Sequence, residues 1–229
     1  IPATSDPSPR IRALNSRVIL YHYVKTTPSG PYAMQVFIHI GYPKTGSSAI
    51  QSHIFTNQRW LENHGIYIPK SGYASGLGHC FLLTGGNPLH SATGKDDSNQ
   101  EAGQLSMLSK ELGACSEAGF SKALISWEGL ALLGKDSIEN ISAALRDHQV
   151  TILAYVRDPV DLYQSAVLQE IESLWNYHEE ILEDDHNIRD TRLLGRDFSS
   201  TLGEWESCFD GNIQIRVRVF DRNRLVDNN

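Results

Sequence analysis

Three short runs of this chain are almost continuously apolar, and they constrain its fold more than any other feature. They are VFIHI (residues 36–40), ALISW (123–127) and TILAYV (151–156). Strands without a polar face are typical of a parallel sheet covered by helices. A fourth run, IQIRVRVF (213–220), alternates apolar with polar residues, so we expect a strand with one wet face, nearer a sheet edge.

Helical spacing of apolar residues separates these strands. It occurs at four places: Ile50, Ile54 and Leu61 up to Gly65; Leu105, Leu108, Leu112 and Cys115; Ile138, Ile141 and Leu145; and Leu162, Ala166 and Leu174. The alternation of strand and helix predicts an α/β fold with a central parallel β-sheet flanked by helices, a three-layer sandwich like that of P-loop NTPases.

We expect residues 36–229 to form this α/β domain. Residues 1–35 carry several prolines around one apolar piece, RVILYHYV (17–24), which predicts an N-terminal arm or an added strand. Residues 71–100 are rich in glycine and small polar residues, and a loop of this length in a compact domain is usually functional or mobile.

Composition excludes several classes of function. The net charge of -7 argues against broad binding to nucleic acids or anionic membranes, so a phosphate ligand would be held by a few placed cations. Cys80, Cys115 and Cys208 lack the spacing of a zinc site, and we expect them to be reduced packing residues. No apolar run reaches the ~20 residues of a membrane span. Because the sequence starts without Met, a removed upstream anchor stays open.

The segment GYPKTGSS (41–48) follows the first apolar strand and opens the helix expected from near Ser47. It therefore lies at the carboxyl end of a parallel strand, where open α/β sheets bind ligands. Lys44 precedes Gly46 by two residues, whereas in the Walker A pattern the lysine follows the second glycine. Helix-start amides, two serine hydroxyls and a lysine favour an anion. The alternative is an ordinary strand-to-helix turn with Ser47 as N-cap.

The segment RDPVDLYQS (157–165) follows the strand TILAYV. Asp158 is expected to cap a helix with Pro159 in its first turn, which places Ser165 about two turns into that helix. Arg157, at the strand end, can hold a phosphate bidentately. Taken alone, Arg157 would equally fit a surface ion pair, and Ser165 a small packing residue.

Together the two loops resemble those of the sulfotransferases that use 3′-phosphoadenosine 5′-phosphosulfate (PAPS). The first family signature, P-K-x-G-[ST]-[ST], matches Pro43–Ser48, and the second, R-[DN]-P-x-[DE]-x-x-x-S, matches Arg157–Ser165. The looser pattern of bacterial-type members fits GIYIPKSG (65–72), Ser126-Trp127-Glu128 and VRVFDRNRL (217–225). The resemblance runs from about Val36 to Leu225.

The resemblance implies where the cofactor lies. Lys44 and the backbone around it would hold the 5′-phosphosulfate, while Arg157 and Ser165 would hold the 3′-phosphate that is also present in the product, 3′-phosphoadenosine 5′-phosphate (PAP). The full set of cofactor-binding residues is Pro43, Lys44, Thr45, Gly46, Ser47, Ser48, Arg157 and Ser165.

The resemblance also implies in-line sulfuryl transfer to a hydroxyl of a saccharide, lipid or other metabolite, with Lys44 neutralising charge on the leaving oxygen and no metal. It implies a cytoplasmic location, as for bacterial-type members. Family members usually continue after the last strand with helices and a basic segment, for which no good counterpart follows IQIRVRVF. We therefore expect the domain to lack its C-terminal part.

The acceptor hydroxyl needs a general base, usually His or Glu in this family. His79, in the glycine-rich loop, is slightly favoured, because a neutral imidazole accepts a proton near neutral pH. Glu128, directly after ALISW, is the second candidate, and Glu62 is a third. The ordinary alternatives are a solvated loop histidine and a helix-capping carboxylate. His39, inside a strand, is expected to be a buried strand residue.

Two other functions stay open. A P-loop kinase or nucleotide hydrolase predicts a lysine directly after Gly46 and a magnesium-binding aspartate after an apolar strand, and Ser47 counts against it. The other is a non-catalytic PAP-binding module, because the sequence does not fix the base and the usual C-terminal part is absent.

Overall fold

A computed structural model describes most of the residues expected to form the α/β domain. The described residues are 22–23, 34–42, 44–74, 78–80, 82, 98–158, 160–165, 167–168, 198–210 and 213–220. Pro43 and Pro159, each in one of the two signature loops, lie outside them, as does Leu174.

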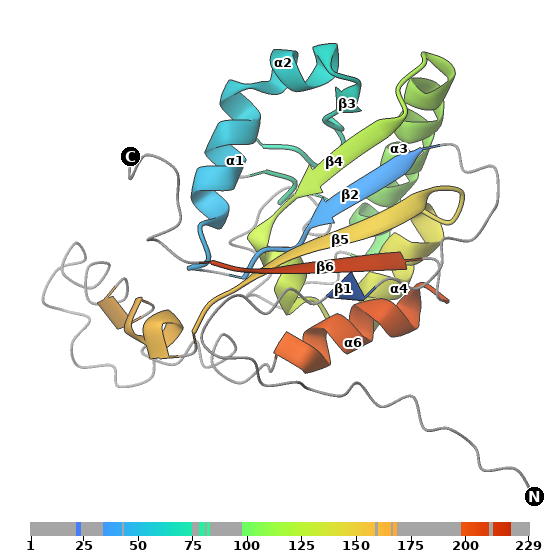
Figure 1. Ribbon diagram of the computed structural model, residues 1–229. Helices are drawn as coiled ribbons and strands as arrows, with labels where there is room; N and C mark the ends of the chain where they lie inside the picture. Colours follow the sequence, from blue (N-terminus) through green and yellow to red (C-terminus); the bar gives the residue numbers. More distant parts are fainter. Residues whose placement is uncertain are drawn as a thin grey trace, which may run out of the picture.

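A six-stranded sheet in the order β1-β6-β5-β2-β4-β3 forms the centre of the molecule (Figure 1). Its strands are β1 (His22–Tyr23), β2 (Gln35–His39), β3 (Ile66–Tyr67), β4 (Lys122–Ser126), β5 (Gln149–Val156) and β6 (Ile213–Val219). All neighbouring strands are parallel except β1, which pairs antiparallel with β6. The predicted α/β fold with a central parallel sheet flanked by helices is confirmed.

The helices are α1 (Ser47–Thr56), α2 (Gln58–Asn63), α3 (Ser98–Glu117), the 3-10 helix η2 (Glu128–Leu132), α4 (Lys135–Ala144) and α6 (Phe198–Cys208). Residues 160–165 and 167–168 are also helical. Leu108 of α3, Ile138 of α4 and Trp205 of α6 share one core with the buried residues of β2, β4 and β5. In Figure 1, α3 and α4 lie behind the sheet, whereas no labelled helix crosses in front of β2, β5 and β6.

The order of the strands creates a switch point beside β2. From β2 the chain runs through α1 and α2 to β3 and β4 on one side, and from β4 it crosses to β5 on the other side of β2. The loops after β2 and β5 therefore leave the sheet next to each other, in the crevice where open α/β sheets bind ligands. These are the two signature loops.

Most sequence-based boundaries hold, with four differences. The helix expected up to Gly65 is divided at Asn57, whose φ of -107° ends α1 before α2 starts. The last three residues of the expected loop 71–100 already belong to α3. The strand β3 and the helix α6 were not predicted. The added strand expected within RVILYHYV is present as β1, at the edge beside β6.

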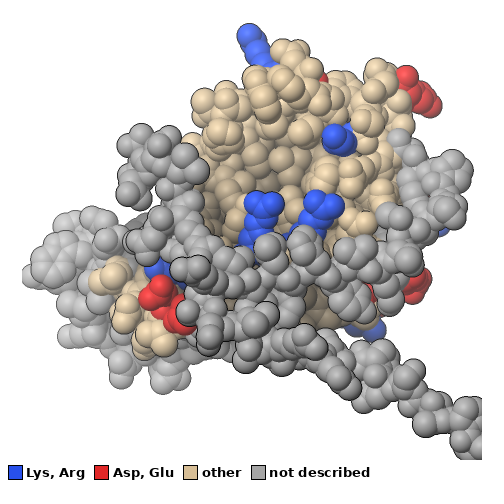
Figure 2. Space-filling model, viewed as in Figure 1, with Lys and Arg blue, Asp and Glu red and all other residues tan. Residues whose placement is uncertain are grey.

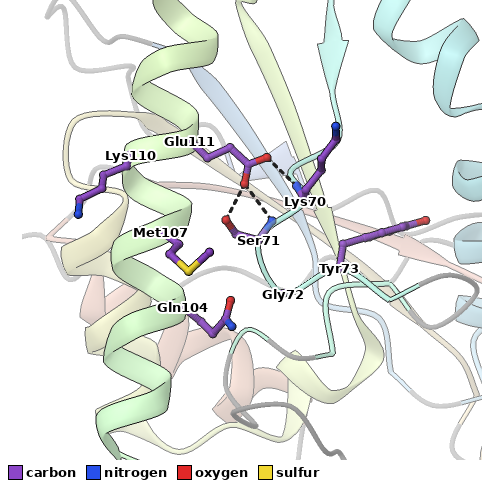
Figure 3. A pocket seen from close by; sticks show the side chains of 8 residues that line it. All are labelled: Lys70, Ser71, Gly72, Tyr73, Gln104, Met107, Lys110 and Glu111. Atoms are coloured by element: carbon purple, nitrogen blue, oxygen red, sulfur yellow. Dashed lines mark hydrogen bonds between the residues drawn. The ribbon is translucent and has the colours of Figure 1, made fainter.

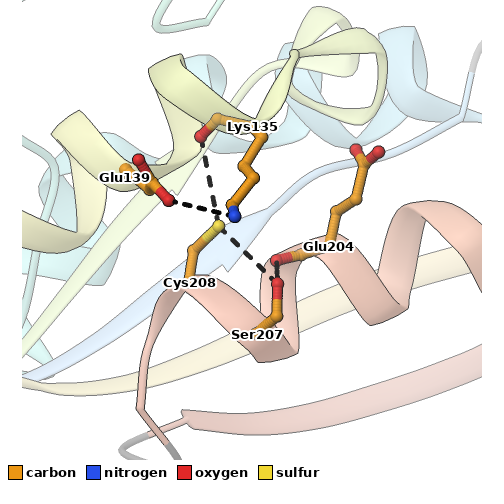
Figure 4. A network of polar contacts seen from close by, with 5 residues as sticks. All are labelled: Lys135, Glu139, Glu204, Ser207 and Cys208. Atoms are coloured by element: carbon orange, nitrogen blue, oxygen red, sulfur yellow. Dashed lines mark hydrogen bonds and ion pairs between the residues drawn. The ribbon is translucent and has the colours of Figure 1, made fainter.

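The three cysteines are free, as predicted. Cys208 joins α6 to α4, because its thiol lies 4.0 Å from the carbonyl oxygen of Lys135 (Figure 4). Lys135 in turn pairs with Glu139 one turn along α4, at 3.5 Å. None of the described helices is long and apolar enough to cross a membrane.

Candidate functional site

The loop after β2 closes on one carbonyl group. The carbonyl oxygen of Tyr42 accepts hydrogen bonds from the Thr45 amide at 3.2 Å, from the Thr45 hydroxyl at 2.5 Å and from the Ser47 hydroxyl at 3.1 Å. Thr45 and Ser47 are buried. Lys44 stands at the top of this turn with φ 66°, in the left-handed region that non-glycine residues rarely adopt.

The turn presents the start of α1 without a side-chain cap. The N-cap is Gly46, with φ 82°, and not Ser47 as in the alternative of an ordinary strand-to-helix turn. No side chain of the described residues caps the helix and its first turn holds no acidic residue, so the first amide groups keep their capacity to bind an anion. Ser48 is exposed, whereas the Ser47 hydroxyl is held by Tyr42.

Phe220 explains why position 46 is a glycine. A Cβ at Gly46 would lie 2.6 Å from Cε2 of Phe220, the first residue after β6. The Phe220 amide donates to the Val156 carbonyl oxygen at 2.7 Å, which holds the backbone of Phe220 beside the end of β5. The guanidinium carbon of Arg157 lies 5.8 Å from the centre of this ring.

Arg157 joins the two loops directly. Its Nη1 donates to the Lys44 carbonyl oxygen at 3.2 Å, across 113 residues of sequence. Its Nε lies 3.8 Å from Oδ2 of Asp161, and only 10% of the Arg157 side chain is exposed. Arginine has five N–H donors, so this arrangement leaves donors for a further anion. The structure thus brings Lys44 and Arg157 together, as the two loops require.

The helix after β5 begins as predicted. Oδ1 of Asp158 accepts hydrogen bonds from the amides of Val160 at 2.9 Å and Asp161 at 3.3 Å, which is the geometry of an N-cap. Ser165 lies in this helix and is half-buried.

Glu128, just after β4, lies within electrostatic reach of Lys44 in the first loop. It opens η2 directly after Trp127 and lies half-buried. Burial raises the pKa of its carboxyl group, and the positive charge of Lys44 lowers it in part. A carboxylate with a raised pKa, within electrostatic reach of the loop lysine, is suited to take up a proton.

His39 lies beneath the first loop as the buried strand residue that was expected. Its Nδ1 is 2.8 Å from the Ser126 hydroxyl, and its Nε2 has no hydrogen-bond partner among the described residues. Burial lowers its pKa to about 4, so the ring is neutral near neutral pH. A Cβ on Gly41, whose φ is 23°, would clash with the Ser47 hydroxyl and lie 3.1 Å from Nε2 of His39, so position 41 requires the smallest residue.

His79 does not occupy the position expected of a base. Its side chain is fully buried, its Nε2 lies 3.0 Å from the Pro69 carbonyl oxygen, and its Nδ1 accepts from the Ser126 amide at 3.0 Å. Burial lowers its pKa to about 4. Because backbone groups occupy both ring nitrogens, this geometry argues against His79 as the base and also against a solvated loop histidine. Its position is structural, between the end of β4 and the segment after β3.

Glu62, the third candidate base, lies in α2 and accepts a hydrogen bond from Nε2 of Gln58, one turn earlier, at 3.1 Å. This contact, with φ 76° at Gly65, is typical of a helix end. The contacts of Glu62 are therefore those of a helix end and do not indicate a role as the base.

Glu111 marks a second polar cluster, beside a cavity of about 590 Å³ (Figure 3). Its carboxylate accepts from the Tyr67 hydroxyl at 2.6 Å, the Lys70 amide at 2.7 Å, and the Ser71 amide and hydroxyl at 2.9 and 2.6 Å. Burial raises the pKa of Glu111, but hydrogen bonds from Ser71, Tyr67 and the backbone outweigh this and lower it. This carboxylate ties α3 to the segment after β3.

Sequence reasoning missed the roles of Phe220 and Tyr42. Phe220 carried one usable signal, since it is the residue that follows an alternating strand at the ligand edge of the sheet. Tyr42 acts through its backbone carbonyl, and because every residue has one, the residue type gives no signal of this role.

Comparisons with known proteins add little to this geometry. No protein-family model matches the chain, and no curated protein matches it. A solved structure from the PezAT chromosomal toxin-antitoxin system of Streptococcus pneumoniae is similar at 15% identity, covering 86% of this chain and 71% of that chain with a TM-score of 0.36. A likeness at that TM-score carries no conclusion about fold or function.

Proposed function

We propose that this chain transfers the sulfuryl group of PAPS to an acceptor hydroxyl. One observation supports the proposal above all others: the two loops that carry the family signatures leave the sheet side by side and are joined by the hydrogen bond from Arg157 to the Lys44 carbonyl oxygen. Neither loop is specific alone, but a donor with phosphate groups at both ends of its ribose needs two neighbouring anion sites.

In this proposal the start of α1 and Lys44 bind the 5′-phosphosulfate. The uncapped first-turn amides offer hydrogen bonds, and the helix dipole adds a favourable field for an anion. Lys44 offsets the charge that grows on the phosphate oxygen as its bond to sulfur breaks. The remaining donors of Arg157, with Ser165, hold the 3′-phosphate.

Glu128 is the base that we propose for the acceptor hydroxyl. The hydroxyl oxygen forms its bond to sulfur while the bond from sulfur to the bridging oxygen breaks, and Glu128 takes the proton that the hydroxyl loses. Burial has raised the pKa of this carboxyl group, which strengthens it as a base. The backbone hydrogen bonds of both ring nitrogens argue against His79 in this role.

The first test is a calorimetric titration of the protein with PAP. We expect micromolar or tighter binding, and a loss of at least ~10-fold in both Lys44→Ala and Arg157→Ala, because each variant removes charge-assisted hydrogen bonds. Lys135→Ala is the matched control, since its ion pair with Glu139 lies on α4.

ATP with magnesium serves as the comparison ligand. Binding of ATP and magnesium that equals or exceeds that of PAP would favour the kinase or hydrolase function. PAP binding without turnover of PAPS on a broad panel of hydroxyl acceptors would favour a non-catalytic module. Absence of PAP binding to the wild-type chain would contradict the sulfotransferase proposal.

A further inference from the structure

The strand β6 places two arginines on the wet face of the sheet. Ile213, Ile215 and Val217 point into the core or pack against it, whereas Arg216 and Arg218 are exposed. Their nearest neighbours across the strand pair are Leu153 and Tyr155 of β5. The alternation predicted from the sequence therefore serves to hold two cations beside apolar side chains.

These residues line a cavity of about 270 Å³. Its walls are Phe37, Leu153, Ala154, Tyr155, Arg216 and Arg218. The volume is near the lower end of the ~300–1,000 Å³ of ligand pockets, which suits one ring-sized group. Figure 2 shows this face hollowed, with basic side chains and no acidic ones at the centre of the view.

The two arginines are not neutralised within the part of the chain that the structure describes. There the ion pairs involve Lys135 and Arg157, and the side chains of Arg216 and Arg218 make neither an ion pair nor a hydrogen bond with a described residue. Two residues apart on one face of a strand, their backbones are roughly 7 Å from each other, so their charges repel. An anion between them would relieve this repulsion.

The cavity adjoins the proposed transfer site. Tyr155 lies edge-on to His39, with ring centres 5.8 Å apart, beneath the first loop. Phe220, two residues after Arg218, lies against Gly46 and Arg157. From Arg216 to Phe220 the strand covers roughly 13 Å, about the length of two to three sugar rings.

Resting on the proposed function, we propose that this cavity binds an acidic group of the acceptor, and that the acceptor is a saccharide carrying carboxylates or sulfates. Arg216 and Arg218 bind the acidic substituent, and Phe37, Leu153 and Tyr155 pack against the ring. The next rings then extend along β6 toward Lys44 and Glu128. A lipid acceptor would not need two cations in the wall of the cavity.

The test is a calorimetric titration with two oligosaccharides, a heparin-derived hexasaccharide and the neutral maltohexaose. We expect the wild-type chain to bind the acidic probe and not the neutral one. The double variant Arg216→Gln/Arg218→Gln should weaken that binding by at least ~10-fold. Lys122→Gln/Lys135→Gln removes the same charge from other surfaces and should change it by less than ~2-fold.

Two results would overturn the subsite. One is that the hexasaccharide fails to bind, or binds equally to both double variants. The other is that the affinity for PAP falls in the double variant Arg216→Gln/Arg218→Gln, because the cavity would then bind the nucleotide. Thermal melting verifies that the variants fold. If the wild-type chain binds the hexasaccharide through both arginines but does not bind PAP, the anionic subsite stands and the sulfotransferase proposal fails.

Discussion

Two polar clusters lie at the ends of parallel strands in this molecule, and their chemistry is opposite. In the first cluster, the Glu111 carboxylate accepts four hydrogen bonds from β3 and the segment after it, and these bonds lower its pKa. Around Lys44, the start of α1 has no side-chain cap, and burial raises the pKa of Glu128. The polar groups of the first cluster have their hydrogen-bond partners within the chain, so we call it saturated, whereas the second cluster has groups left for a ligand.

This difference separates structural polar groups from functional ones. A buried group whose hydrogen bonds are all made within the chain stabilises the fold and has nothing left for a ligand. A group left with spare donors, a raised pKa or a strained backbone has that capacity, at a cost in stability. His79 belongs with Glu111 on this criterion, although its sequence neighbourhood pointed to catalysis.

Replacing each of the two carboxylates by an amide should give the largest difference between the two clusters. We expect Glu128→Gln to lower kcat by roughly 100- to 10,000-fold on the best acceptor from a hydroxyl panel, because the base is lost. Glu111→Gln should leave kcat unchanged and destabilise the fold by about 2 kcal/mol, because it weakens hydrogen bonds to a charged group.

Activity assays and urea denaturation of both variants check this pair of results. In wild type, the raised pKa of Glu128 should move the acidic limb of the kcat/KM profile above the usual carboxyl range. A loss of kcat in Glu111→Gln, with Glu128→Gln still active, would reverse the assignment of the two clusters.

The sequence predicted the parts of the site that depend on patterns. Buried strands appear as apolar runs, parallel strands bring their following loops to one edge, and Asp158 carries the signature of an N-cap, which the structure bears out. The structural role of His79 could not be predicted, because its partners are the backbone groups of Pro69 and Ser126. Any residue type can supply such backbone groups, so the sequence does not indicate them. The bond from Arg157 to the Lys44 carbonyl oxygen was hidden for the same reason.

Acid should weaken the fold through His39 and His79, two of the three histidines that are buried in the described part of the chain. Burial lowers the pKa of both His39 and His79 from 6.5 to about 4, so the unfolded chain binds more protons than the folded chain within this range. Stability is therefore full above about pH 6.5 and falls with pH toward about 4. Between about pH 7 and about pH 5 each histidine should remove about 2 kcal/mol from the free energy of unfolding.

Urea denaturation at the two pH values measures this loss. Glu128 acts in the opposite direction, because a raised pKa makes the folded chain hold its proton more firmly, whereas the lowered pKa values of His148 and Glu111 add to the loss. His39→Gln should reduce the pH dependence, whereas replacement of the exposed His64 by Gln should not. An equal pH dependence in wild type and His39→Gln would show that burial does not keep this ring neutral.

The smallest effect concerns the strain at Lys44. Its φ of 66° is unfavourable for a side chain by roughly 1–2 kcal/mol, and glycine adopts it freely. Lys44→Gly should therefore stabilise the fold by about 1 kcal/mol or less, since glycine also loosens the unfolded chain. Lys44→Ala retains the strain and should show no such gain, while both variants lose PAP binding. Equal stability of the two variants in urea denaturation would mean that the left-handed backbone at position 44 is not strained.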